Sequence, residues 1–253
     1  MKMVLLRVGV DSGSGGIQGP LFPDGSFDFV PIPDNSGYGL RTYGNTLGVK
    51  GVPLSEYFPK GRQNAIHGQS MHVDPEFETF TYGDPTAPKA GLRRLQRGDM
   101  LVFYAGLSGW GYECEPALYL VGYFMVEWAG LATDLPWHEL KKRCGKNFHV
   151  MHDELYRQQR ERLVLVQGGP GSRLLTRAHC ISAISCNKMG QPLKVLSPSA
   201  QKIFGDFDGR ISIQRSPPRW VHETHVNKAK TFWSLWSSFV PADCEFSIRL
   251  CRF

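Results

Sequence analysis

The sequence predicts a mixed α+β fold with a mainly antiparallel, barrel-like sheet and a few peripheral helices. Segments rich in β-branched and aromatic residues outnumber the helical ones. They do not alternate with helices in the βαβ order of a parallel sheet, and the chain shows no internal repeat. Its 253 residues suffice to bury a full core.

Strands are expected wherever a short apolar run carries many β-branched or aromatic residues. These runs are residues 3–10, 27–32, 100–105, 117–129, 162–167 and 179–184. Two helices have clear start signals. Residues 135–144 follow the capping pair Thr133–Asp134 and carry Pro136 in the first turn, and residues 197–204 open with Ser-Pro.

The domain organisation follows from two less regular stretches. Residues 31–62 are rich in glycine and tyrosine, and a loop of this length inside a domain is usually functional. The last stretch is rich in tryptophan and phenylalanine, and its Phe232, Trp233 and Trp236 lie at helical spacing, as expected for a packed helix. We expect one domain over residues 1–225 and an aromatic-rich tail over residues 226–253.

Composition limits the class of protein. No apolar stretch approaches the roughly 20 residues needed to cross a bilayer, and Asp11 interrupts the first apolar run before a signal peptide is complete. The six cysteines are scattered and form no C-x-x-C pair, as in proteins that keep their thiols reduced. These features predict a cytoplasmic protein that does not bind a membrane.

Positive charge is concentrated in the second half of the chain. Residues 1–126 hold 10 Lys or Arg against 12 Asp or Glu, whereas residues 127–253 hold 19 against 11. The densest basic stretch runs from Lys141 to Arg177. This asymmetry favours a nucleic-acid or nucleotide partner for the basic half, although a solvated helix face explains a single run of charge equally well.

Two glycine-rich turns are candidate phosphate sites, because glycine lets an anion approach several backbone N–H groups. Each follows an apolar strand, and we expect them to flank one pocket. A flexible turn or a helix cap explains the same residues without a ligand. The candidate residues are Asp11, Ser12, Gly13, Gly15, Gly16 and Gln18 in the first turn, and Ser172, which would cap a short helix, with Arg173 in the second.

An acidic segment at residues 69–85 is the candidate catalytic region. In an extended chain His72, Asp74 and Glu76 project from one face, where they could divide acid and base work or hold a metal. Tyr82 lies nearby as a ligand contact. A capped, charged turn is the structural alternative, and Pro75 favours an irregular loop. The remaining histidine pairs lie far away in sequence, so neither a metal nor a cofactor is specified.

Aromatic residues provide candidate base-stacking positions. Tyr104 and Trp110 lie in and after the strand at 100–105, and Arg219 precedes Trp220. An indole beside an arginine offers a stacking plane and a phosphate contact to a single-stranded or flipped base. The same pair also packs readily in ordinary proteins.

Two resemblances to known families extend this interpretation. The motifs GDMLVFYAGL and LVGYFMVE, within residues 92–127, are similar to the core of the PUA-like superfamily, which includes EVE, YTH and ASCH domains. That resemblance implies a small pseudo-barrel that binds nucleic acids or modified bases, often between aromatic side chains.

Four segments together resemble the third of the nucleotide modification associated domain families, from residue 3 to about residue 225. They are RVGVDSGSGGIQGPLFPDGSFDFVPIPD, HVDPEFETFTYGDP, GDMLVFYAGL and GGPGSRLLTRAHCIS. The resemblance implies a role in making, processing or recognising a modified nucleotide, in company with DNA-modification systems of phages and bacteria.

Three functions are compatible with these observations. The favoured one is an enzyme, or an accessory of one, that acts on a nucleotide or nucleobase in DNA, with Asp11, His72, Asp74 or Glu76 in acid, base or metal work. The alternative is a reader of modified bases that uses Tyr104, Trp110 and Trp220. The third is a structural component that docks protein partners in a modification complex.

Overall fold

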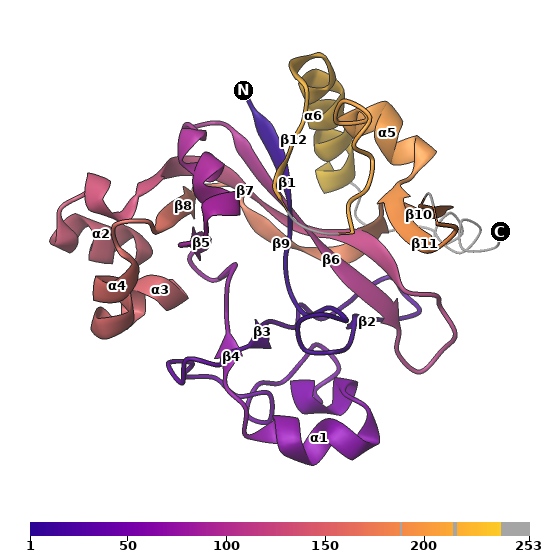
Figure 1. Cartoon of the computed structure of the whole chain (residues 1–253), viewed down its shortest axis with the longest axis horizontal. Helices are drawn as coiled ribbons and strands as arrows, with labels where there is room; N and C mark the ends of the chain where they lie inside the picture. The colour runs from indigo at the N-terminus through magenta and orange to yellow at the C-terminus, as the bar shows by residue number, and fades with distance from the viewer. Residues whose placement is uncertain (188, 215–216, 239–253) are drawn as a thin grey trace.

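The computed structural model of the chain describes residues 1–187, 189–214 and 217–238, and of residues 233–238 it describes the backbone alone. The α+β class and the mainly antiparallel sheet are confirmed (Figure 1). The large sheet has the strand order β12-β1-β6-β7-β8-β5, with β2 added beside β6 and β9 beside β7.

The strands are β1 (Met3–Arg7), β2 (Gly19–Leu21), β3 (Ile32–Pro33), β4 (Met71–His72), β5 (Thr81–Asp84), β6 (Met100–Gly109), β7 (Ala117–Leu131), β8 (Val164–Gly168), β9 (Arg173–Cys180), β10 (Ser182–Cys186), β11 (Pro192–Leu196) and β12 (Arg219–Trp220). The helices are α1 (Lys60–His67), α2 (Trp137–Cys144), α3 (Phe148–Met151), α4 (Asp153–Gln159), α5 (Pro198–Phe204) and α6 (Glu223–Ser238), with 3₁₀ turns η1 (Leu54–Tyr57), η2 (Ala87–Arg94) and η3 (Ala132–Asp134).

The central strands are continuously apolar because they are covered on both faces. Successive side chains of a strand point to opposite faces. In β6, Leu101 and Phe103 enter one core cluster, while Val102 and Tyr104 enter the cluster on the other side. A sheet with two cores does not show the apolar–polar alternation of a strand that faces water.

The sheet remains open in the part of the chain that the structure describes, since its path ends at β12 on one side and at β5 on the other. The expected closed, barrel-like sheet is therefore not formed. The pairing also contains parallel strands: β1 and β2 both run parallel to β6, at successive positions along it. Strand β7 pairs with β6 and β9 in its first part and with β8 in its last part, after a register shift between Val126 and Trp128.

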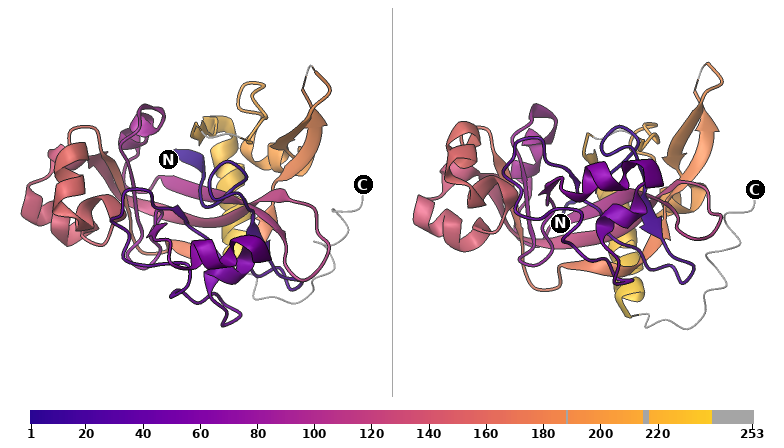
Figure 2. Two further views of the ribbon diagram at one scale, coloured as in Figure 1. Left: turned by 60° about the horizontal axis from the view of Figure 1, so that its bottom comes forward. Right: turned by 90° about the horizontal axis from the view of Figure 1, so that it is seen from below.

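Helices α2, α3 and α4 form a lobe inserted between β7 and β8. The lobe lies at one end of the long axis of the molecule, and the β10–β11 hairpin lies near the other (Figures 1 and 2). Both predicted helices are confirmed, as α2 and α5. The Ser197 Oγ accepts a hydrogen bond from the Ala200 N–H at 3.2 Å, which is the expected cap.

The predicted strand over residues 27–32 is wrong except at its last residue, where the short β3 begins. This region belongs to a loop-rich segment with its own core, in which Phe22, Tyr43, Tyr57 and Phe58 are buried. The segment packs below the sheet with α1 (Figure 1). Buried aromatic rings hold these loops in place without a long strand.

Helix α6 runs across residue 225, where we expected the domain to end. Its Val226 and Ala229 are buried in the same cluster as Phe204 of α5, and Phe232 packs against the ring of Phe204 at 6.3 Å. The side chains of Trp233 and Trp236, and residues 239–253, lie outside the described part. None of the described helices is both long and apolar enough to pass through a bilayer.

Candidate active site

Three side chains that are distant in sequence converge where the sheet meets the helical lobe. They are His72 at the end of β4, Asp74 two residues later, and His149 in α3. One nitrogen or oxygen atom from each lies within 4.8 Å of the others. This His72–Asp74–His149 cluster joins the acidic segment to a histidine whose role the sequence does not indicate.

Asp74 is the buried carboxylate of the cluster, with a side chain only 3% exposed. Its Oδ2 accepts a hydrogen bond from the Gly83 N–H at 2.8 Å and lies 3.6 Å from the His149 Nε2. Among the described residues its Oδ1 has no hydrogen-bond partner. Burial raises the pKa of Asp74 well above its usual value, and the negative charge of Asp84 adds to the effect.

His149 is held by the helical lobe. The Asn147 Oδ1 accepts the His149 N–H at the start of α3, and the His149 Nδ1 lies 2.7 Å from the Gln159 Oε1 of α4. Burial lowers the pKa of His149, which favours the neutral imidazole. Since an amide oxygen only accepts, the single N–H of that ring is on Nδ1, and Nε2 presents its lone pair to Asp74.

His72 closes the cluster from the other side. It pairs with Ile32 across β3 and β4, and its ring stacks on Phe148 with centroids 3.9 Å apart. Its ring centroid is 4.8 Å from that of His149. Burial lowers the pKa of His72 to about 3, so the cluster at neutral pH contains two neutral imidazoles and one carboxyl group.

Further buried polar groups surround the cluster. The Tyr82 hydroxyl donates to Asp84 Oδ2 at 3.0 Å, and Lys89 is buried with a pKa lowered by burial and partly restored by Asp84. The amide of Asn147 lies near enough to Asp74 to favour its charged form, but the two groups do not form a hydrogen bond. Gly83 allows this close approach, because a Cβ there would lie 2.8 Å from the Asn147 Oδ1.

The other two predicted acidic residues do not join the cluster. Glu76 accepts hydrogen bonds from the Thr79 N–H and hydroxyl, and so stabilises the turn that leads into β5. Asp11 accepts the N–H groups of Gly13 and Ser14, both at 2.7 Å, and pairs with Arg7 at 3.2 Å. Both carboxylates are used within their own turns.

The two glycine turns lie at opposite ends of β6. Gly19 pairs with Leu107, whereas the second turn bonds to Met125, the partner of Met100. The seven residues between Met100 and Leu107 span roughly 23 Å. The structure therefore does not bring the turns into one pocket. The predicted helix after Ser172 is also wrong, because Arg173 begins strand β9, which pairs with β7.

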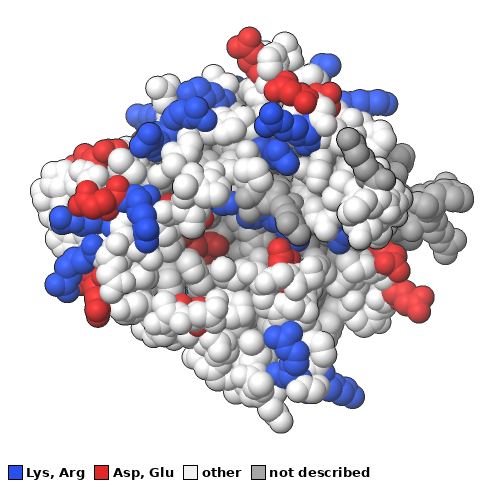
Figure 3. All heavy atoms as spheres, in the orientation of Figure 1, with Lys and Arg blue, Asp and Glu red and all other residues white. Residues whose placement is uncertain are grey.

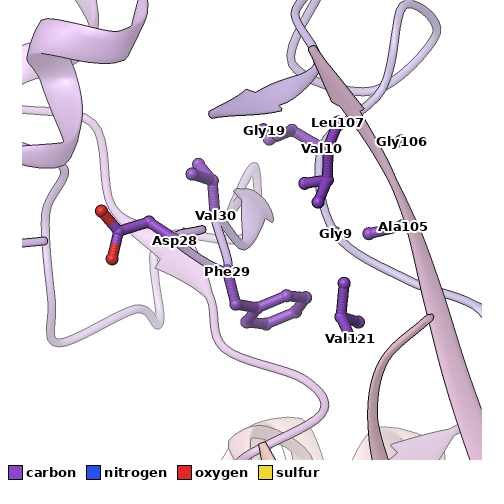
Figure 4. A pocket seen from close by; sticks show the side chains of 10 residues that line it. All are labelled: Gly9, Val10, Gly19, Asp28, Phe29, Val30, Ala105, Gly106, Leu107 and Val121. Carbon is purple, nitrogen blue, oxygen red and sulfur yellow. The ribbon is translucent and has the colours of Figure 1, made fainter. Parts of the chain in front are cut away.

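The first turn and its surroundings leave little space for a ligand. Gly15 lies against Val10 and Pro33, and Gly16 lies against Arg62. The pocket next to β2 is lined by apolar side chains such as Phe29 and Val121, and it is too narrow to hold a water molecule (Figure 4). Ser12 and Gln18 belong to the same loop region as this narrow, apolar pocket.

The predicted stacking aromatics are mostly used in packing. Tyr104 is fully buried, and its hydroxyl donates to the Ile213 carbonyl at 3.1 Å. Trp110 packs edge-on against Phe22 and Tyr57. Trp220 pairs with Val4 in the sheet and lies under the guanidinium of Arg94 at 5.0 Å.

The two predicted arginines, Arg219 and Arg173, also contact other residues of the domain. Arg219 donates to the Ser212 carbonyl at 2.8 Å. Arg173 is exposed and lies over the ring of Tyr123 at 5.9 Å. Arg173 therefore keeps one open side for an anion.

A groove on the helical lobe includes two arginines of the basic stretch, Arg157 and Arg160. It has a volume of about 570 Å³. Its lining consists of Thr133, Leu135, Trp137, Asp153, Tyr156, Arg157, Arg160 and Glu161. Acidic and basic side chains are interleaved over this lobe (Figure 3), and several are paired, for example Lys141 with Asp153 at 3.2 Å.

Sequence reasoning set His149 aside, with its neighbour His152, as too far from the acidic segment, and it missed Asn147 and Gln159. They are more than 60 residues from the acidic segment, and a position in a helical lobe gives no sign of which strand it faces. The one usable signal was the segment Asn147–Phe148–His149, in which a capping residue precedes a histidine in a short, strongly polar stretch.

Fold and site define an α+β protein with a buried His–Asp–His cluster between its sheet and an inserted helical lobe. The chain belongs to the family of nucleotide modification associated domain 3, whose model matches residues 2–234 and thus reaches into α6. Neither the curated proteins nor the solved structures gave a match. The family name associates the chain with nucleotide modification.

Proposed function

We propose that this protein is an enzyme that modifies a nucleotide or nucleobase in DNA modification, with the His72–Asp74–His149 cluster as its reaction centre. The observation that carries the proposal is the buried Asp74 carboxyl group, for one oxygen of which the described residues supply no partner, beside an imidazole whose pKa is lowered by burial. An unpaired buried carboxyl is unfavourable for folding, and such arrangements are concentrated at functional sites.

The two groups have complementary acid–base properties. Burial raises the pKa of Asp74 and lowers the pKa of His149, so that near neutral pH Asp74 retains a proton more readily than an exposed aspartate, and His149 presents a free lone pair. Opposite shifts in neighbouring groups divide the roles of general acid and general base.

The groove on the helical lobe supports a phosphorylated substrate. Arg157 of α4 and Arg160, directly after this helix, line the groove beside Asp153 and Glu161. The last residue of α4, Gln159, contacts His149. Trp137 is 40% exposed at its edge and offers an aromatic face. A nucleotide or single-stranded DNA held here by its phosphates would be bound by the same helix that orients the reaction centre.

No observation favours the reader of modified bases to the same degree. Its three proposed stacking residues, Tyr104, Trp110 and Trp220, pack within the protein, as described above. Tyr104 is fully buried, and Trp110 and Trp220 are partly buried with their rings in contact with neighbouring side chains. The function as a reader of modified bases is therefore kept as one possible outcome of the following test.

The test compares the nucleosides of cells that express the wild type or Asp74→Asn. DNA and free nucleotides are digested to nucleosides and analysed by mass spectrometry. We expect an additional or depleted nucleoside with the wild type and none with Asp74→Asn, which keeps the shape of the side chain. Glu78→Gln, in an exposed residue of the same segment, is the matched control and should behave as the wild type.

Identical nucleosides with the wild type and with Asp74→Asn would refute the enzymatic function. If the wild-type protein then bound DNA that contains a modified base more tightly than plain DNA, the reader would replace it. Affinity for DNA should fall with added salt, because lysine and arginine displace counterions from phosphate.

A further inference from the structure

We propose that His72, Asp74 and His149 form a binding site for one divalent first-row transition-metal ion, such as Fe²⁺ or Zn²⁺. As an account of the cofactor of the reaction centre, the proposal rests on the proposed function, but metal binding itself is measurable without knowing the substrate. With an ion bound, Asp74 and His149 are its ligands, and this role replaces the acid–base roles that the two groups have in the metal-free protein. The argument starts from the atoms that face one another.

The His149 Nε2 and the Asp74 Oδ2 face each other at 3.6 Å, a separation longer than a hydrogen bond. The other ring nitrogen, His149 Nδ1, lies 2.7 Å from the Gln159 Oε1, which only accepts, so Nδ1 carries a ring proton. Nε2 is therefore the ring nitrogen that is placed as a ligand beside Asp74. A ring nitrogen and a carboxylate oxygen at this separation, both buried, are placed as two ligands of one cation between them.

The spacing agrees with metal coordination. Zinc lies about 2.0–2.2 Å from imidazole nitrogen and carboxylate oxygen, so two ligands of one ion are roughly 3 to 4.2 Å apart. The Asp74–His149 pair falls in this range, and all three ligand atoms lie within 4.8 Å of one another. Closing the longest separation requires a shift of about half an ångström, which a side-chain rotation provides.

The surroundings of the cluster match those of known metal sites. A metal-binding histidine almost always donates its other ring nitrogen to a neighbour, which fixes its orientation, as Gln159 does for His149. The ligating carboxylate is usually hydrogen-bonded in turn, as Asp74 is by the Gly83 N–H at 2.8 Å. Asp74 Oδ1, for which the described residues supply no partner, is a second oxygen available to the ion.

The ligand types decide the class of metal. Two imidazoles and one carboxylate favour Fe²⁺, Zn²⁺ and similar ions, whereas Mg²⁺ and Ca²⁺ prefer oxygen ligands alone. Three protein ligands also leave coordination positions for water or substrate, as in catalytic sites rather than in closed structural sites. His72 and Asp74 are partly buried residues, and His149 is buried.

The test titrates the chelator-treated, full-length protein with Zn²⁺ and Co²⁺ in a calorimeter, and follows the visible absorption of Co²⁺. We expect one ion per chain, and no binding of Mg²⁺ at the same concentration. Asp74→Asn and His72→Gln should each weaken binding about tenfold or more. His222→Ala removes an exposed histidine outside the cluster and should bind as the wild type does.

Circular dichroism and thermal unfolding without metal show whether each variant folds. His72→Gln, at a partly buried position, serves as the second variant if Asp74→Asn fails to fold. Absence of stoichiometric binding in the wild type, or unchanged binding in the folded variants, would overturn the metal site and leave a shared proton as the link between Asp74 and His149. If the nucleosides change in a way that depends on Asp74 but the protein binds no metal, the proposed function stands and the metal site is refuted. If the protein binds metal but no nucleoside changes, the metal site stands and the proposed function is refuted.

Discussion

Replacing His72 with phenylalanine should remove a large part of the acid sensitivity of the metal-free protein. Burial lowers the pKa of His72 from 6.5 to about 3. The unfolded chain takes up a proton on this ring between these two pH values, whereas the folded chain does not. The stabilising contribution is therefore complete above pH 6.5 and is lost as the pH falls toward 3.

The magnitude follows from the shift in pKa. A difference of this size corresponds to an upper limit of about 5 kcal/mol of unfolding free energy, reached below pH 3. Between pH 7.5 and pH 4.5, His72 alone should remove about 3 kcal/mol, a large part of the stability of an ordinary domain. In the His72→Phe variant, the phenyl ring keeps the stacking on Phe148 and does not titrate.

The assay is urea unfolding of the wild type and His72→Phe at pH 7.5 and pH 4.5, with chelator present. The quantity compared is the loss of unfolding free energy between the two pH values, because titrating groups that do not interact with His72 affect both proteins alike. His149 and Asp34, which do interact with it, are part of the difference. His222→Ala, at an exposed position, is the control and should lose as much stability as the wild type. An equal loss in the wild type and His72→Phe would refute the assignment of a buried, neutral imidazole to His72.

Three other substitutions test the packing around the site and the fold. Gly83→Ala would place a Cβ 2.8 Å from the Asn147 Oδ1 and 3.0 Å from the His149 Cδ2, so it should weaken metal binding about tenfold, and unaltered titration curves would count against the close approach. Ser197→Ala removes the cap of α5 and should lower the unfolding free energy by about 1 kcal/mol in urea unfolding; no change would mean that the cap is solvated. Trp110→Ala should lower the unfolding free energy by about 3 kcal/mol, since the ring packs against Phe22 and Tyr57. A variant that stays stable but no longer prefers modified DNA would instead support the function as a reader of modified bases.

The predictions confirmed by the structure depend on local patterns. Residues 100–105 and 117–129 consist mostly of aliphatic and aromatic residues, and they lie in β6 and β7, the buried centre of the sheet. Helix α5 begins at its predicted cap, Ser197. Helix α2 forms over most of the predicted range, but Thr133 and Asp134 lie in the turn η3 and do not cap it, and α2 begins directly after Pro136. The fold class follows from these elements. Whether the sheet closes into a barrel does not follow from them, because closure depends on whether two edge strands that are distant in sequence pair with each other.

The candidate site was predicted in part. His72 and Asp74 were selected from their spacing, and both lie in the cluster. Glu76 follows the same spacing, but β4 ends at His72, so the alternation of an extended strand does not continue to it. The glycine turns were assigned to one pocket from their similar compositions, although their positions along β6 differ by most of a strand length.

The sequence by itself determined which residues are apolar, capped or acidic, and through them the α+β class, the central strands and two members of the site. Only the tertiary structure decided that His149 faces Asp74, that β1 runs parallel to β6, that Tyr104 is buried and that Trp110 packs against Phe22 and Tyr57. The physical reason is range: hydrophobic periodicity and capping act over a few residues, whereas the partner of a buried carboxylate is set by how a sheet and an inserted lobe pack together.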